Sequence, residues 1–242
     1  MALPKIKHSA YTHKLKGIDK TVSFRPYTNA EQKILLLAKE EGKDDKTRML
    51  DAITQILSNC IMDNIEVYDL PMFDIEDIFI RIREKSVGEI IPVKFRYNYD
   101  DENGVKKTDF VTVSVNIKDI QVQGEFVKKA RSIIVDKANN IGIKLRYPTL
   151  RDIKELEGST EDSDLLSRCI EVIFDENEVY DPKDQTKEEM DEFIDDIEAI
   201  PMLEIKEFFE KMPKIFYETQ VYKKHLDETE TVKIQGLEGF FT

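Results

Sequence analysis

The strongest constraint on the fold is a pair of alternating segments with a turn signal between them. Apolar residues occupy every second position from Ile91 to Tyr99, and again from Val111 to Ile117. A period of two places such side chains on one face of a strand. Between the two segments lies Asn103-Gly104, a pair that favours the tight turn of a β-hairpin. The sequence therefore predicts an antiparallel hairpin in this region.

A shorter hairpin and two helices are predicted ahead of these strands. Residues 11–25 contain two short β-prone runs and predict the first hairpin. Thr28 followed by Glu31 is a capping box, which opens a helix that ends at Gly42. A second helix is expected over residues 46–61. The apolar positions of these two helices are Ala30, Ile34, Leu37, Ala38, Met49, Ile53, Ile56, Leu57 and Cys60.

A third helix is predicted between Pro71 and Gly88, because proline is favoured in a first turn and glycine just after a last turn. Phe73 and Ile80 widen its apolar stripe beyond one face. Such a helix is either buried on two sides within the chain or contacts a partner. We therefore take Phe73 and Ile80 as candidate partner-binding residues. The positions expected to point inward are Ile75, Ile78, Phe79 and Ile82.

The second half of the chain repeats the order of the first. Residues 141–145 alternate into Arg146-Tyr147-Pro148-Thr149 with Asp152 after them, as residues 24–28 are followed by Glu31. Residues 201–205 likewise parallel residues 71–75. We therefore predict two halves, 1–122 and 123–242, each with a strand pair, a helical middle and a closing hairpin. The alternative is coincidence, since proline-capped helices recur in unrelated proteins.

The middle of the second half also has helical patterns. Thr186 and Glu189 form a capping box, and the chain after Pro213 reads as extended. The acidic run from Asp175 to Glu189 is interpreted as a solvated loop and the start of a helix. The fold class is α+β, with antiparallel β-hairpins flanking helical segments. The apolar positions assigned to the first helical segment of this region are Leu165, Leu166, Cys169, Ile170 and Ile173.

Charge and cysteine content narrow the function classes. The formal net charge of −13 opposes nucleic-acid binding, which depends on clustered Lys and Arg. No stretch approaches eighteen uncharged apolar residues and the N-terminus lacks a signal-peptide core, so we expect a cytoplasmic location and no membrane partner. Cys60 and Cys169 both fall on apolar stripes and are interpreted as buried hydrophobic residues, not as a disulfide or a metal pair.

The sequence contains no convincing catalytic or cofactor motif. The histidines, His8, His13 and His225, have no spacing that predicts a zinc site or a catalytic triad. Residues 100–102 are acidic but lack the alternating oxygen ligands of a calcium-binding loop. No phosphate-binding glycine loop is present. We predict no catalytic residues, no metal, no cofactor and no small-molecule substrate.

An apolar cluster lies among the last residues of the sequence, Leu237, Phe240 and Phe241. Exposing a phenylalanine forgoes roughly 1.5 to 3 kcal/mol of burial free energy. We therefore expect this cluster to be buried, either in the core of this chain or in a neighbouring protein. These three residues join Phe73 and Ile80 as candidate partner-binding residues.

The segment from Leu70 to Glu89 resembles the family of T-even-like bacteriophage baseplate hub proteins and hub assembly proteins. It joins a helix start, a charge pattern and a glycine stop over about twenty positions. The segments Met1–Lys5, Val22–Leu36, Phe208–Lys214 and Gly236–Phe241 are similar to the same family, so the resemblance covers nearly the whole chain. Where some relatives carry paired cysteines, this sequence has residues 222–225, Tyr-Lys-Lys-His, so a metal role is not carried over.

The resemblance implies a non-enzymatic protein that acts in tail baseplate assembly, as a structural subunit or as an assembly chaperone. Its expected partners are other phage baseplate hub and tail proteins, in the host cytoplasm during assembly and in the virion tail baseplate. Two alternatives come from other classes. One is a phage-encoded hydrolase of the tail that works through carboxylates, and the other is a nucleic-acid module, which the acidity of the chain opposes.

Overall fold

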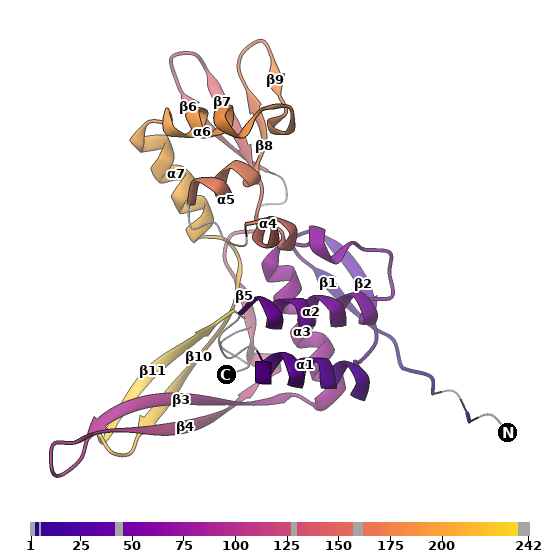
Figure 1. Cartoon of the computed structure of the whole chain (residues 1–242), viewed down its shortest axis with the longest axis vertical. Coiled ribbons are helices and arrows are strands. Elements are labelled where there is room, and N and C mark those ends of the chain that lie inside the picture. Colours follow the sequence, from indigo (N-terminus) through magenta and orange to yellow (C-terminus); the bar gives the residue numbers. More distant parts are fainter. Residues whose placement is uncertain (1–2, 5, 42–45, 127–129, 157–161, 237–242) are drawn as a thin grey trace.

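The structure, a computed structural model, describes residues 3–4, 6–41, 46–126, 130–156 and 162–236. Within these ranges the chain forms seven α-helices and eleven strands, and the strands make four small antiparallel sheets (Figure 1). The predicted α+β class, with hairpins flanking helices, is therefore confirmed. None of the helices in the described ranges has both the length and the apolarity needed to cross a lipid bilayer.

The first half follows the predicted order of elements closely. The long hairpin turns at residues 103–104, and Gly104 has a φ of 75°, a backbone angle that glycine adopts readily. The third helix ends at Gly88, with a φ of 102°. Only Ile117 departs from the predicted strand, because it begins a short 3-10 turn. The elements are β1 (Tyr11–Leu15), β2 (Lys20–Phe24), α1 (Asn29–Glu41), α2 (Lys46–Cys60), α3 (Met72–Val87), β3 (Ile90–Asp100), β4 (Lys106–Asn116) and β5 (Gln121–Gln123).

Helix α1 buries a different set of residues from the one expected. Leu37, predicted to lie on the apolar face, is 56% exposed, and Ala30 is exposed too. Leu35 packs against the core instead, beside the buried Ala38. The prediction for Leu37 and Ala30 is wrong because α1 touches the core along a narrow stripe. The predicted end of this helix at Gly42 lies outside the described residues.

The second half contains the predicted hairpins and one misassigned segment. Ile170 and Ile173 were expected in a helix, but α5 stops at Cys169 and these residues form strand β8. Their β-branched side chains favour a strand, and pairing with β7 fixes it. The elements are β6 (Arg131–Asp136), β7 (Ile141–Leu145), α4 (Leu150–Glu155), α5 (Asp162–Cys169), β8 (Ile170–Phe174), β9 (Val179–Tyr180), α6 (Lys187–Asp195), α7 (Ala199–Glu210), β10 (Lys214–Lys223) and β11 (Glu228–Gln235).

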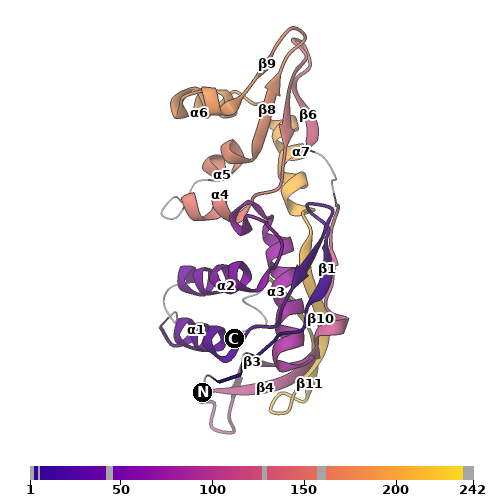
Figure 2. The ribbon, with the colours of Figure 1, turned by 90° about the vertical axis from the view of Figure 1, so that its right-hand side faces the viewer.

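The elements form two sides along the long axis of the molecule. Helices α1, α2, α4, α5 and α6 lie one above another on one side, and most strands lie on the other (Figure 2). Strand order within the largest sheet is β6-β7-β8-β9, and β5 pairs with β10 in the sheet β11-β10-β5. Because Val122 pairs with Ile215 there, the end of the first half is joined to the closing hairpin of the second.

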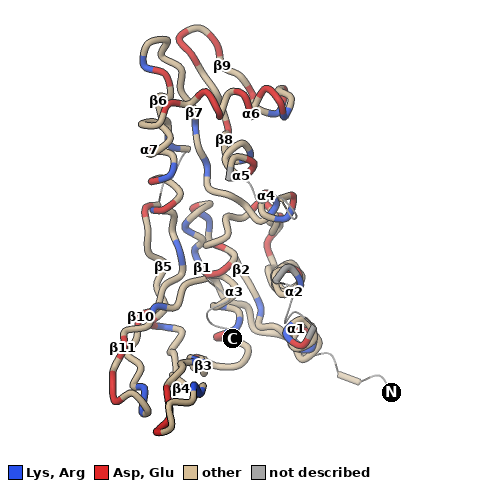
Figure 3. The backbone as a smooth tube through the Cα atoms, turned by 60° about the vertical axis from the view of Figure 1, so that its left-hand side comes forward, with Lys and Arg blue, Asp and Glu red and all other residues tan. Residues whose placement is uncertain are grey.

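Charge is distributed unevenly along the molecule. Residues 1–122 contain 19 basic and 20 acidic side chains, whereas residues 123–242 contain 17 basic and 29 acidic ones. Many of the second half's acidic residues lie around β9 and α6 (Figure 3). The acidic run from Asp175 to Glu189 is mostly exposed, which agrees with its interpretation as a solvated segment. The negative charge of the protein is therefore largely a property of its second half.

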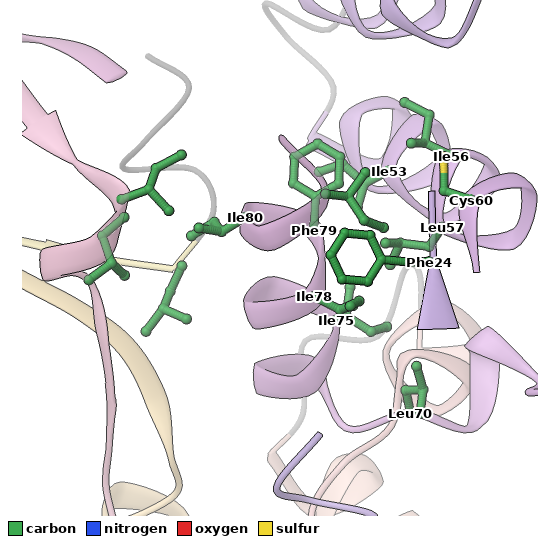
Figure 4. Packing of buried hydrophobic residues seen from close by; sticks show 14 of the residues in the cluster. Phe24, Ile53, Ile56, Leu57, Cys60, Leu70, Ile75, Ile78, Phe79 and Ile80 are labelled. Carbon is green, nitrogen blue, oxygen red and sulfur yellow. The ribbon is translucent and has the colours of Figure 1, made fainter. Parts of the chain in front are cut away.

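Two hydrophobic clusters form the core, and each contains residues from both halves. The first surrounds α3, where Phe24, Leu57 and Phe79 pack together (Figure 4). It also contains Leu150 of α4, Ile215 of β10 and Ile234 of β11, which are at most 2% exposed. The second cluster lies in the upper part of the molecule and includes Phe73 of α3. The two sequence halves therefore share their cores.

Candidate interaction surfaces

A largely buried ion pair fixes the junction between β2 and α1. Arg25 donates from Nη2 to Glu31 Oε1 at 2.6 Å and from Nη1 to the Pro26 carbonyl at 2.9 Å. Glu31 also accepts from the Thr28 N–H at 2.6 Å, so one carboxylate pairs with the arginine and caps the helix. The Arg25 N–H donates to the Cys60 carbonyl at 2.9 Å, which attaches the end of α2 to the same junction.

The same arrangement recurs between β7 and α4. Arg146 donates to the two carboxylate oxygens of Asp152 at 2.6 and 2.9 Å, and to the Tyr147 carbonyl at 3.1 Å. Asp152 accepts from the Thr149 N–H at 2.7 Å and completes a capping box. The Arg146 N–H donates to the carbonyl of Cys169, the last residue of α5, at 3.0 Å. The arginine, the cap and the cysteine are therefore all repeated.

The two junctions account for shifted pKa values. The hydrogen bond from Arg25 lowers the pKa of Glu31 to about 2. Burial favours a higher pKa for Asp152, but the hydrogen bonds from Arg146 and Thr149 outweigh it and hold that pKa below its usual range. Burial raises the pKa of Cys60 to about 11 and that of Cys169 to about 12. Both thiols are free, buried and protonated at neutral pH, as expected of cysteines that act as small hydrophobic residues.

Two further carboxylates attach the first hairpin to α3. Asp74 is 1% exposed and accepts from the Gly17 N–H at 3.0 Å and the Ile18 N–H at 3.2 Å. Burial raises its pKa, and these hydrogen bonds partly offset the effect. Asp77 lies 2.7 Å from His13 Nε2 on β1. Both carboxylates therefore hold the β1–β2 hairpin in place.

The described carboxylates show no grouping that could bind a metal ion. In the ranges that the structure describes, no three His, Cys, Asp or Glu side chains are grouped so that they could hold a metal ion. A groove of about 670 Å³ lies where the halves meet, lined by Pro71, Tyr147 and Phe208 among others. Its Arg146 is already paired with Asp152. A second groove, of about 850 Å³, is lined by Asp152 and by other acidic residues.

The two long hairpins are joined near their tips, side by side at the lower left of Figure 1. His225, in the turn between β10 and β11, stacks on Tyr99 of β3 with ring centroids 4.0 Å apart. Its Nε2 lies 3.0 Å from Asp109 Oδ2 of β4, and Lys224 Nζ lies 3.2 Å from the same oxygen. Hydrogen bonds from the Phe110 N–H and from Lys224 hold the pKa of Asp109 below its usual range. Sequence reasoning missed this role of His225, because nothing local links residue 225 to residues 99 and 109.

The candidate partner-binding residues fall into two groups. Phe73 and Ile80, on α3, are 2% and 0% exposed. Phe73 packs edge-on against Tyr147 and Phe126, with ring centroids 5.4 and 5.9 Å away, and Ile80 belongs to the first core cluster. Burial on two sides thus explains their wide stripe, and in this structure neither residue is exposed to a partner. Leu237, Phe240 and Phe241 lie outside the described residues.

Sequence reasoning did not single out the aliphatic residues exposed on α7. Ile200 is 67% exposed and Leu203 is 64% exposed. On the same helix, Pro201, Ile205 and Phe208 are buried. The signal was present, since α7 has apolar residues on more than one face, as α3 does.

Comparison with known proteins gives one match. The sequence model of a family described as "T4 bacteriophage base plate protein" matches residues 8–242. Searches of the curated proteins and of the solved structures gave no match. The matched region includes the junctions around Arg25 and Arg146 and both long hairpins. Because the match covers nearly the whole sequence, the chain belongs to the T4 bacteriophage base plate protein family.

Proposed function

We propose that the chain acts in assembly of the hub of the phage tail baseplate, through protein–protein interfaces and without catalysis. It acts there as a structural subunit or as an assembly chaperone. The observation that carries the proposal is the family match over residues 8–242. The hub assignment is further supported by the resemblance of the Leu70–Glu89 segment, which forms most of α3.

A role through interfaces agrees with the chemistry of the described residues. Glu31, Asp74 and Asp152 are the least exposed of the carboxylates with shifted pKa values, and each accepts backbone hydrogen bonds within the fold. Asp152 lines a groove of about 850 Å³, but Arg146 and the Thr149 N–H already bind its carboxylate, which argues against a role in general acid or base catalysis. The long hairpins and the exposed residues of α7 instead offer surface for protein partners. The partners we propose are other hub and tail proteins, met in the host cytoplasm during assembly and in the tail baseplate.

The test is quantitative mass spectrometry of purified phage particles beside lysates of infected cells, counting this chain against known tail proteins. A fixed stoichiometry in particles is expected of a structural hub subunit. Abundance in lysate with absence from particles is expected of an assembly chaperone. Absence from both preparations would overturn the proposed function.

The terminal cluster of Leu237, Phe240 and Phe241 is proposed as one partner-binding segment. Its support is the cost of exposing two phenylalanines to water. We expect Phe240→Asp with Phe241→Asp to remove at least one phage protein from a pull-down. The matched control is Val105→Asp, at an exposed position in the β3–β4 turn. Retention of every phage protein by the double variant would remove this segment from the proposal.

We also propose that residues 1–122 and 123–242 derive from duplication of one unit. The support is the agreement of the two junctions in the bonds of Arg25 and Arg146, in the helix caps and in the positions of Cys60 and Cys169. Proline-capped helices are common in unrelated proteins, but chance does not explain why the arginine contacts, the helix caps and the cysteine positions all recur together. A duplicated chain presents two surfaces, one from each half, that are related in sequence but differ in exposed residues.

A further inference from the structure

Two exposed residues at the start of α7 correspond in sequence to two buried residues around the start of α3. Pro71 precedes α3, and Pro201 lies in the first turn of α7. Counted from these prolines, Ile200 corresponds to Leu70 and Leu203 corresponds to Phe73. The exposed fractions are 67% and 64% for Ile200 and Leu203, against 1% and 2% for Leu70 and Phe73. The second half therefore lacks the cover that the first half has.

The cover over α3 comes from the second half of the chain. The Leu150 N–H donates to the Leu70 carbonyl at 3.1 Å, and Tyr147 packs against Phe73. Among the described residues no such unit follows α7, because the chain returns along β10 to the first core. The apolar side of α7 around Ile200 and Leu203 is thus left for another molecule.

A second copy cannot cover α7 by stacking its first half there in the same way. Counted from the junction arginines, the fully buried Leu150 corresponds to Asn29, which is polar and exposed. Tyr147 likewise corresponds to Pro26, which has no aromatic ring. The first half lacks the apolar groups that such a contact needs, so the occupant must be a different segment.

The N-terminal segment Leu3–Ala10 has the complementary chemistry. Leu3 is 90% exposed and Ile6 is 82% exposed. Residues 3–10 contain two lysines, one histidine and no acidic residue, whereas residues 195–210 contain six acidic residues and one lysine. In Figure 1 this segment leaves the body on the side away from α7 of its own chain. A contact between the two therefore joins separate molecules.

We propose that Leu3–Ala10 of one copy docks on the Ile200–Glu207 side of α7 in a second copy. Leu3 and Ile6 cover Ile200 and Leu203, while Lys7 approaches Glu204 and Glu207 at the edge. Residues three and four apart lie together on a helix surface, so Glu204 neighbours Ile200 and Glu207 neighbours Leu203. Self-association of this kind is independent of the proposed baseplate role, because it requires no other phage protein.

The first test mixes two variants with one added cysteine each, Ile6→Cys and Leu203→Cys, on chains of different tag length. The native Cys60 and Cys169 are fully buried and stay unreactive in the folded protein. We expect mild oxidation to give a mixed disulfide dimer. The matched control is Ile6→Cys with Val179→Cys, because Val179 is 72% exposed in an equally acidic region. Equal yields from the two mixtures would overturn the proposal, since general attraction to acidic surface would explain both.

The second test is sedimentation of the purified full chain over a concentration series. We expect wild-type protein to self-associate, more weakly in high salt, because opposite charges contribute to the contact. Leu3→Ser with Ile6→Ser, and separately Leu203→Ser, should each weaken association at least about tenfold. Lys7→Glu should weaken it as well, and Glu204→Lys on the partner copy should restore part of the loss. A wild-type chain that stays monomeric throughout the series contradicts the proposal.

Discussion

At the scale of single residues, the pair of Arg25 and Glu31 makes the stability of the protein depend on pH. A glutamate in an unfolded chain titrates near about 4.3, whereas the pKa of Glu31 in the fold is about 2. A lowered pKa adds stability that is present above the unfolded value and is lost as pH falls through the folded value. Allowing for the partial exposure of Arg25, we expect this pair to contribute about 2 kcal/mol to the free energy of unfolding at pH 5, and this contribution to be lost as the pH falls to about 2. Urea denaturation across this range measures it.

The matched variant for that experiment is Glu31→Gln, which keeps the size of the side chain and removes its charge. Its free energy of unfolding should vary less with acidification, because the carboxylate that titrates is absent. Glu40→Gln, at an exposed position on the same helix, should behave as wild type. If wild type and Glu31→Gln lose stability in parallel below pH 5, the ion pair does not have the assigned role.

A second residue-scale prediction concerns Gly17 in the turn of the first hairpin. A Cβ atom at this position would lie 2.5 Å from Asp74 Oδ2 and 2.9 Å from two ring atoms of Phe73. Both neighbours are buried and have little room to move. We expect Gly17→Ala to destabilise the protein by roughly 1 to 3 kcal/mol in thermal or urea unfolding. Combining it with Phe73→Leu should cost less than the sum of the single changes, and strict additivity would argue against the close contact.

At the scale of elements, the contact between the two long hairpins depends on a few groups near their tips. His225→Ala removes the ring that stacks on Tyr99 and lies beside Asp109. We expect faster amide exchange in the β10–β11 turn and in β3 near Tyr99, with the helices unchanged, because the groups that contact His225 lie on strands β3 and β4. Hydrogen exchange with mass spectrometry measures this effect. The control is His8→Ala, at an exposed position outside any helix or strand. Equal exchange in the two variants would contradict the stabilising role assigned to His225.

Elements whose signals are local were predictable from sequence, and elements that depend on distant partners were not. The β3–β4 hairpin and α3 carry their own turn, cap and stop residues, so the hairpin and the bounds of α3 followed from the sequence. Strand β4 begins at Lys106, ahead of the alternating run that starts at Val111. The segment from Ile170 to Phe174 looked like more helix because its apolar spacing suits both structures, and only pairing with β7 makes it a strand. Strand β5 has three residues and exists through its pairing with β10. Apolar residues on more than one face of α7 were visible in the sequence, but α3 has the same pattern and buries it, so the sequence could not show that part of α7 is exposed.

At the scale of the whole molecule, the two halves are similar in sequence order but interlocked in space. The first core cluster is completed by Leu150, Ile215 and Ile234 from the second half. The second cluster is completed by Phe73 from the first half. Burying each such side chain contributes roughly 1.5 to 3 kcal/mol, which is a large share of the net stability of a protein this size. Neither half should therefore be stable alone, despite its full set of elements.

We accordingly expect residues 1–122 and residues 123–242, produced as separate fragments, to lack cooperative unfolding transitions, and an equimolar mixture to regain one. Circular dichroism during heating, with the intact chain for comparison, measures this. An intact chain should show one transition, because loss of either cluster exposes residues that complete the other. Two separate transitions, or a first fragment that unfolds cooperatively by itself, would contradict the interlocked core.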